Sequence, residues 1–205
     1  TIGSYAFSDC TNLSNVIIPK GVTTIGDAAF RYMSGITSIF LPKSLEKLAV
    51  GTDANNGIAT SYYPEYYRTF VGCDSLTRIE VATGNQKYVT KDGILYAYGD
   101  ENKATDLIAC PAGYAVNEGK AVILGTVRTI WSYAFANNVS LREVSFEAPV
   151  YKEGETATTI NIEMGKNVFE NAKNLKRVTL GTGVQTINDY MFRYCESLEY
   201  VFIPN

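Results

Sequence analysis

The 205-residue sequence contains no histidine. Histidine is the commonest general base near neutral pH and a common metal ligand, so its absence removes every His-dependent triad. A Cys-x-x-Cys pair, a phosphate-binding glycine loop and a G-x-S-x-G nucleophile turn are missing too. We therefore expect no catalytic, cofactor-binding or metal-binding residues, and a protein that is not an enzyme.

Long apolar runs and a strong charge of either sign are also lacking. No window approaches the roughly 18 consecutive apolar residues that cross a bilayer. The net charge of −3 provides no electrostatic footprint for nucleic acid. Thr1 already lies inside a repeat, so we expect any signal or anchor segment outside these residues. The sequence thus predicts no nucleic-acid partner and no membrane insertion in this segment.

What the sequence does contain is a repeat of the type Ile25-Gly-Asp-Ala-Ala-Phe30. Spacings of 23 residues separate the first two repeat phenylalanines and also the last two, and larger spacings are explained by insertions. A fixed period interrupted at defined places is typical of a solenoid. The repeat phenylalanines are Phe7, Phe30, Phe70, Phe135, Phe169 and Phe192.

Apolar residues recur at fixed offsets after each repeat phenylalanine. The sixth position is Leu or Ile, and the ninth and eleventh positions are apolar with polar neighbours in most copies, as at Ile39 and Leu41. This alternation predicts one strand per repeat with one buried face, and stacked repeats would form a parallel ladder of seven strands. The Ala-Phe segment on the opposite side is predicted to form a short helical or 3-10 turn.

One repeat buries too little apolar surface to be stable alone, so neighbouring turns must stack. We predict a single leucine-rich-repeat-type solenoid over residues 1–205, α/β to mostly β, with about six 23-residue repeats. Insertions are expected at about 49–67, 83–120 and 147–163. The second should be a small β-module, because Asp92-Gly93 between two apolar runs is a strong hairpin signal.

The repeat resembles that of the BspA-like leucine-rich repeat family of bacterial cell-surface proteins. The family pattern I-G-x-x-A-F-x-x-C-x-x-L-x-x-[IV]-x-[IL]-P-x-x-V is matched from Ile2 to Val22 and again from Ile187 to Pro204. The inserted module, with Asn85, Tyr88 and Asp92-Gly93-Ile94-Leu95-Tyr96, is also similar to a segment of that family. The resemblance implies a curved right-handed superhelix, an adhesion or protein-binding role, and no catalytic residues.

Cys10, Cys73 and Cys195 occupy one column of the repeat, where no two cysteines are neighbours. Two turns of separation exceed the span of a disulfide. We expect these thiols, and Cys110 in the module, to be buried small apolar residues.

The solvent-facing strand positions are the first candidates for partner binding. Aromatic residues and arginine are typical interface anchors. The alternative is that these are ordinary cross-strand pairs, such as Arg78 near Glu143, with Phe40 and Phe202 covering neighbouring repeats. The candidates are Ile17, Phe40, Arg78, Glu80, Glu143, Arg177, Tyr200 and Phe202.

The first insertion supplies further candidates: Tyr62, Tyr63, Tyr66 and Tyr67. Tyrosine offers a stiff contact area with a polar end, although these rings could instead fold back over the repeat flank. The leading hypothesis is a non-catalytic, cell-surface or secreted recognition module that binds a protein partner, of the host or a cell surface, through the strand ladder and inserted loops. Alternatives are glycan binding by the tyrosine-rich insertion and a structural spacer for another domain.

Overall fold

The computed structural model describes residues 1–48, 68–99, 102–156 and 160–204. Its regular elements are short strands, the described residues contain one complete 3-10 segment, and no α-helix occurs among them. The elements are β1 Thr24–Ile25, β2 Ser38–Leu41, β3 Lys47–Leu48, β4 Arg78–Val81, β5 Tyr88–Lys91, β6 Ile94–Tyr98, β7 Ala104–Ala109, η3 Val116–Gly119, β8 Lys120–Ile123, β9 Thr129–Ile130, β10 Glu143–Phe146, β11 Glu163–Met164, β12 Arg177–Thr179 and β13 Tyr200–Phe202.

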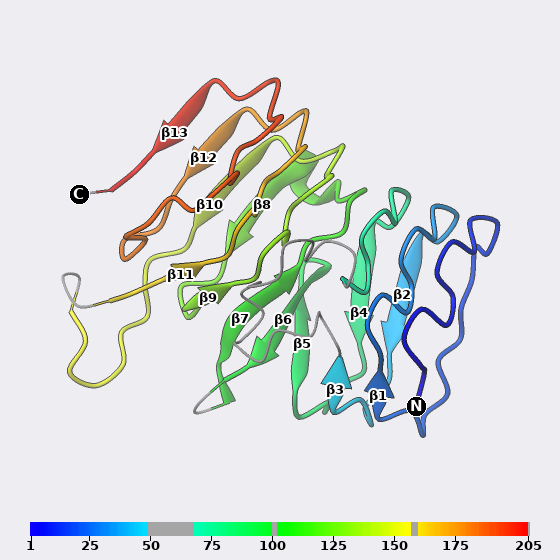
Figure 1. Ribbon diagram of the computed structural model, residues 1–205. Coiled ribbons are helices and arrows are strands. Elements are labelled where there is room, and N and C mark those ends of the chain that lie inside the picture. Colours follow the sequence, from blue (N-terminus) through cyan, green and yellow to red (C-terminus); the bar gives the residue numbers. More distant parts are fainter. Residues whose placement is uncertain (49–67, 100–101, 157–159, 205) are drawn as a thin grey trace.

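Strands of successive repeats stack in parallel, and the termini lie at opposite ends of the molecule (Figure 1). The predicted ladder strands form two sheets, β2–β4 and β8–β10–β12–β13. The alternation of burial matches the sequence pattern, since Ile39 and Leu41 are buried on either side of exposed Phe40. A leucine-rich-repeat-type arrangement with parallel strands is therefore confirmed.

A second row of parallel pairs was not predicted. It runs along the isoleucine that opens each repeat, with β1 paired to β3 and β7, β9 and β11 paired in order. Ile25, Ile130 and Met164 in this row are buried. In four repeats a short strand of this second row thus precedes the ladder strand: β1 precedes β2, β3 precedes β4, β9 precedes β10, and β11 precedes β12.

The Ala-Phe segments form hydrogen-bonded turns, and the prediction of a helical or 3-10 turn there is wrong. In the first repeat, the N–H groups of Ala6 and Ser8 close turns onto residues three positions earlier. The N–H groups of Tyr5, Phe7 and Asp9 instead donate to carbonyls of the next repeat at 2.8 to 2.9 Å. Bonding between repeats therefore replaces the continuous intrasegment bonding that a helix requires.

Hydrogen bonds within a turn thus alternate with hydrogen bonds to the next repeat. This alternation depends on a left-handed backbone conformation at one or two positions of each turn. The residue two places after every repeat phenylalanine has a positive φ, and so does the residue two places before five of them. These residues are Tyr5, Asp9, Ala28, Tyr32, Gly72, Tyr133, Asn137, Asn167, Asn171, Tyr190 and Tyr194. A helix cannot pass through such positions in L-residues.

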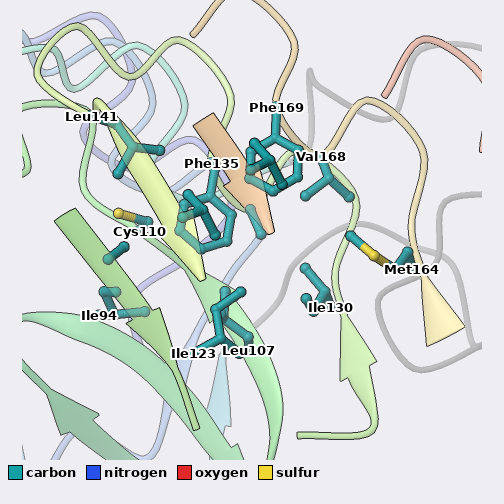
Figure 2. Packing of buried hydrophobic residues seen from close by; sticks show 14 of the residues in the cluster. Ile94, Leu107, Cys110, Ile123, Ile130, Phe135, Leu141, Met164, Val168 and Phe169 are labelled. Atoms are coloured by element: carbon teal, nitrogen blue, oxygen red, sulfur yellow. The ribbon is translucent and has the colours of Figure 1, made fainter. Parts of the chain in front are cut away.

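The repeat phenylalanines stack on one another inside the turns. Phe135 and Phe169 have ring centroids 5.1 Å apart, and Phe169 lies 5.4 Å from Phe192. Figure 2 shows the Phe135 and Phe169 rings side by side among residues of both strand rows, including Ile130 and Met164. Toward the N-terminus, Phe30 stacks between Phe7 and Phe70.

The predicted hairpin is present: β5 and β6 pair antiparallel through a turn at Asp92-Gly93, where both residues have positive φ. The same module interrupts the ladder. The Ile79 N–H of β4 donates to the Gly93 carbonyl at 3.1 Å, and a Cβ on Gly93 would lie 3.2 Å from the Arg78 Cβ. Because the hairpin tip lies beside β4, β4 does not pair with β8, and the prediction of one seven-stranded ladder is wrong.

Two residues at the start of this module, Asn85 and Tyr88, form hydrogen bonds with backbone groups at the end of the preceding repeat. The buried Asn85 amide donates to the carbonyls of Pro42 and Leu45, each at 3.0 Å. Tyr88 Oη accepts a hydrogen bond from the Leu48 N–H at 2.8 Å. The sequence pattern Asn-x-x-Tyr therefore satisfies backbone groups of the neighbouring repeat.

The segment around residues 150–155 is anchored by an ion pair. Arg128 Nη2 contacts Glu155 Oε2 at 2.8 Å and also donates to the Val150 carbonyl, while the Lys152 N–H donates to the same carboxylate oxygen. The Arg128 guanidinium, followed by the Lys152 N–H, lowers the pKa of Glu155. The loop around 150–155 is thus held against the repeat that contains Arg128.

Replacing Glu155 by glutamine should loosen this loop. We expect trypsin to cut after Lys152 about fivefold faster in Glu155→Gln at neutral pH, since an anchoring charge is lost. Because the folded-state pKa is lowered, the stabilisation is complete above the ordinary carboxyl pKa and disappears as pH falls through the lowered value. The difference in melting temperature between the wild type and Glu155→Gln should vanish over the same pH range. Glu163→Gln, at an exposed carboxylate away from the cleaved bond, is the matched control, and equal cleavage of all three proteins would contradict the anchor.

Candidate interaction surface

The first half of the candidate surface lies on β2 and β4. Phe40 is 51% exposed and stands opposite Glu80 in the parallel register. Arg78 Nε contacts Glu80 Oε1 of the same strand at 3.2 Å, and both side chains are about half exposed or more. An ion pair this exposed contributes little to stability. Arg78 does not pair with Glu143, which lies in the other sheet, and that expected cross-strand pair is wrong.

The second half lies on β8, β10, β12 and β13. Here Lys120, Glu143, Arg177 and Tyr200 follow one another across adjacent strands, so charges alternate along the row. In the next row, Phe202 stands opposite Thr179. Tyr200 and Phe202 are 50% and 46% exposed. The structure therefore brings Glu143, Arg177, Tyr200 and Phe202 together in one sheet, separate from Phe40, Arg78 and Glu80.

The remaining candidates fall outside these sheets. Ile17 is highly exposed, but it lies in a segment without strand pairing, so its assignment to a ladder strand is wrong. It precedes the first paired ladder strand, β2, and the described residues give it no strand partner. The tyrosines of the first insertion, Tyr62, Tyr63, Tyr66 and Tyr67, lie outside the described residues.

One exposed apolar residue on a described strand was not among the selected candidates. Val122 on β8 is 44% exposed and stands opposite Ser145. It occupies the same solvent-facing column as Phe40 and Phe202, which is the signal that could have identified it. With Val122 included, apolar side chains are exposed on both sheets.

The cysteines are packing and hydrogen-bonding residues. Cys73 Sγ donates to the Phe30 carbonyl at 2.9 Å, and Cys195 Sγ donates to the Phe169 carbonyl at 3.0 Å. Burial raises the pKa of Cys73 to about 12 and that of Cys195 to about 11, so both stay protonated and weakly nucleophilic at neutral pH. The prediction of burial is confirmed for Cys73 and Cys110, whereas Cys195 is only partly buried, and the prediction is wrong for Cys10, which is exposed.

The described residues offer no further chemistry of a conventional site. None of their Cys, Asp and Glu side chains form a group of three or more that could hold a metal ion. Within the same ranges, no helix has the length and apolar character needed for a membrane span.

Comparison with protein families identifies the repeat. The model of the BspA type leucine-rich repeat region matches residues 1–91 and 115–205, in six copies. The chain belongs to this family. Leucine-rich repeat proteins are generally protein-interaction modules and generally non-enzymatic. The unmatched residues 92–114 contain β6 and β7, so the part that departs from the repeat is the part that interrupts the ladder.

Solved structures of bacterial leucine-rich repeat proteins share the fold. A leucine-rich repeat protein from Eubacterium ventriosum is 22% identical with a TM-score of 0.58, over 98% of this chain and 57% of that chain. The pneumococcal vaccine antigen PcpA is 19% identical with a TM-score of 0.56, over 97% of this chain and 53% of that chain. This chain thus spans a little over half the length of each. The comparison with curated proteins finds no match.

Proposed function

We propose that this BspA-type repeat chain is a non-catalytic recognition module, cell-surface or secreted, that binds a protein partner through the exposed faces of its ladder strands. One observation carries the proposal: four apolar side chains on ladder strands are 44 to 51% exposed. Phe40 and Val122 lie between buried neighbours, and Tyr200 and Phe202 lie on either side of the half-buried Val201. Burying such rings at an interface is favourable, and aromatic residues are enriched among interface hot spots. Alternating charges on Lys120, Glu143 and Arg177 would orient the partner.

The proposal includes the arrangement of the whole chain. Residues 1–205 would form one right-handed, curved solenoid of about six 23-residue repeats, with insertions at about 49–67, 83–120 and 147–163. The two exposed sheets would then face the same side and act as two halves of one surface. The hairpin tip beside β4 would separate them and contribute to the same face.

The test is a double substitution that removes one anchor from each half. The chain is screened against purified extracellular proteins, and the partner found is titrated by calorimetry. We expect Phe40→Ala combined with Tyr200→Ala to raise the Kd at least about 30-fold, which corresponds to about 2 kcal/mol. Val139→Ala, at an exposed apolar residue outside the ladder strands, should leave the Kd unchanged. An unchanged Kd in the double variant would show that the ladder face is not the binding surface.

A further inference from the structure

The inserted strands β5, β6 and β7, which we call the dividing sheet, are buried on both faces. Successive residues of a strand point to opposite faces. On β6, Ile94 belongs to one hydrophobic core and the adjacent Leu95 to another. On β7, Leu107 and Ile108 divide in the same way. All four side chains are at most 4% exposed. Figure 2 shows Ile94 and Leu107 in the core that also contains Phe135.

The two cores lie in different parts of the chain. Besides residues of the dividing sheet, the first core contains buried residues from 18 to 79, and the second contains buried residues from 110 to 191. We call residues 1–48 and 68–82, with β1 to β4, the N-terminal unit, and residues 120–204, with β8 to β13, the C-terminal unit. The dividing sheet lies between β4 and β8 (Figure 1).

The connections that join one repeat to the next elsewhere are missing between these units. β4 and β8 are not paired, so the ladder stops there. In other turns the N–H groups donate to the next repeat, as Phe135 does to the Val168 carbonyl. No carbonyl of the described residues accepts from the N–H groups of Phe70 or Gly72. Phe30 stacks on one side of Phe70, and no described ring stacks on the other side. A pocket of about 50 Å³ lies between the turns around Phe70 and Phe135.

The backbone of the dividing sheet is hydrogen-bonded into the C-terminal unit. β7 pairs with β9, and β9 pairs with β11, in one five-stranded sheet to which the N-terminal unit contributes no described strand. The N-terminal unit is attached by side-chain packing, by the Asn-x-x-Tyr contacts and by hydrogen bonds from Ile79 to Gly93 and from Gly113 to Leu76. Opening the N-terminal unit would therefore leave the dividing sheet paired, whereas opening the C-terminal unit would remove its strand partner.

Trp131 is the residue of the C-terminal unit that reaches the first core. It occupies the position of Gly26 and Gly165, where an added Cβ would overlap the backbone of the preceding repeat. Before Trp131 the preceding segment is β7, and the indole packs against the first core with Arg68 Cζ 5.6 Å from its ring centroid. Since Trp131 is the one tryptophan of the sequence, its fluorescence reports on this boundary.

We infer that the two units open separately, and that the N-terminal unit leaves the dividing sheet while the C-terminal unit stays folded. In a repeat array each repeat is stabilised by the interfaces with its neighbours. Here the ladder, the turn bonds and the ring stack are all interrupted at one interface, so the N-terminal unit opens at a lower free energy than the whole chain. The inserted module thus confines local unfolding to one side. This inference holds whether or not the ladder face binds a protein.

The test uses pairs of adjacent residues on the dividing sheet. Leu95→Ala and Ile108→Ala remove side-chain atoms from the first core, and Ile94→Ala and Leu107→Ala remove as many from the second. Each whole chain is equilibrated in urea, pulse-labelled with deuterium and digested. Mass spectrometry then gives the urea midpoint at which the peptides of each unit lose protection.

We expect the N-terminal unit of the wild type to lose protection at a lower urea concentration than the C-terminal unit. Leu95→Ala and Ile108→Ala should lower the N-terminal midpoint alone, by about 1 M or more. Ile94→Ala and Leu107→Ala should lower the C-terminal midpoint alone by a similar amount. The first change in Trp131 fluorescence should coincide with the N-terminal midpoint, because the indole then loses its contact with the first core.

The adjacent substitutions control for each other, because they lie on the same strand and are equally buried. If an alanine variant is unfolded without urea, Leu95→Val and Ile94→Val give the same comparison with a smaller shift. The inference is overturned if both units of the wild type share one midpoint, if the C-terminal unit opens first, or if Leu95→Ala and Ile94→Ala shift the same peptides.

Discussion

We expect the Phe169→Ala variant to lose about 3–5 kcal/mol of unfolding free energy. Phe169 is fully buried, and its ring stacks on Phe135 on one side and on Phe192 on the other. Removing the ring opens a cavity at two repeat interfaces at once, and stability in a repeat protein depends mainly on such nearest-neighbour interfaces. Urea denaturation followed by circular dichroism measures the loss.

Phe192→Ala is the matched control for this prediction. Phe192 is partly exposed and stacks on Phe169. Because the Phe192 ring buries less apolar surface than the Phe169 ring, Phe192→Ala should lose less than half as much unfolding free energy as Phe169→Ala. Equal losses in the two variants would show that position in the ring stack does not determine the contribution of each phenylalanine.

The ladder strands could be predicted because their pattern is local and repeated. In β2, buried Ile39 and Leu41 alternate with exposed Phe40, and this period of two can be read directly from sequence. The same pattern correctly predicted that Phe40, Tyr200 and Phe202 would be exposed. The second strand row escaped prediction because a strand of two residues, such as β1, is too short to show any period.

The turns were predicted wrongly because bonds between repeats decide their conformation. Ala-Phe segments have no local signal against a helical turn, and alanine is the best helix former. In the folded chain, Phe7 donates to the Ala29 carbonyl of the next repeat, and the flanking residues become left-handed to allow it. This is a tertiary effect that no single repeat shows.

The break in the ladder has a similar origin. Asp92-Gly93 gave a reliable local signal for the hairpin itself. Where the hairpin tip lies depends on the contact between Gly93 and Ile79, which are 14 residues apart in sequence and carry no shared pattern. For the same reason, the sequence placed Arg78 near Glu143, whereas the structure pairs it with Glu80. Which ladder-strand residues are exposed was predictable, and which of them meet was not.

The Asn138→Ala variant should lose about 2–4 kcal/mol, nearly as much as the core phenylalanine. Asn138 has no exposed surface, and its amide donates to the Pro111 carbonyl at 2.5 Å. Its Oδ1 accepts hydrogen bonds from the N–H groups of Ser140 and Leu141 at 3.0 and 2.6 Å. Alanine removes the acceptor of the Ser140 and Leu141 N–H groups and one of the donors to the Pro111 carbonyl, which keeps the hydrogen bond from the Tyr114 N–H. An unpaired buried polar group costs about 1–3 kcal/mol. Urea denaturation gives the total loss, and hydrogen exchange at the Leu141 amide reports the local opening.

Cysteine is the informative control, because the repeat itself uses it in this column. Cys73 and Cys195 occupy the position of Asn138 in other repeats, and each thiol donates to a carbonyl of the preceding repeat. Asn138→Cys should therefore recover the hydrogen bond to the Pro111 carbonyl and lose only the two bonds that Oδ1 accepts. Its unfolding free energy should lie between those of the wild type and Asn138→Ala. If the cysteine variant is as unstable as the alanine variant, donation between repeats contributes nothing, and the column is selected for size alone. If it is intermediate, asparagine and cysteine are two solutions to one requirement, a buried donor that joins each turn to the turn before it.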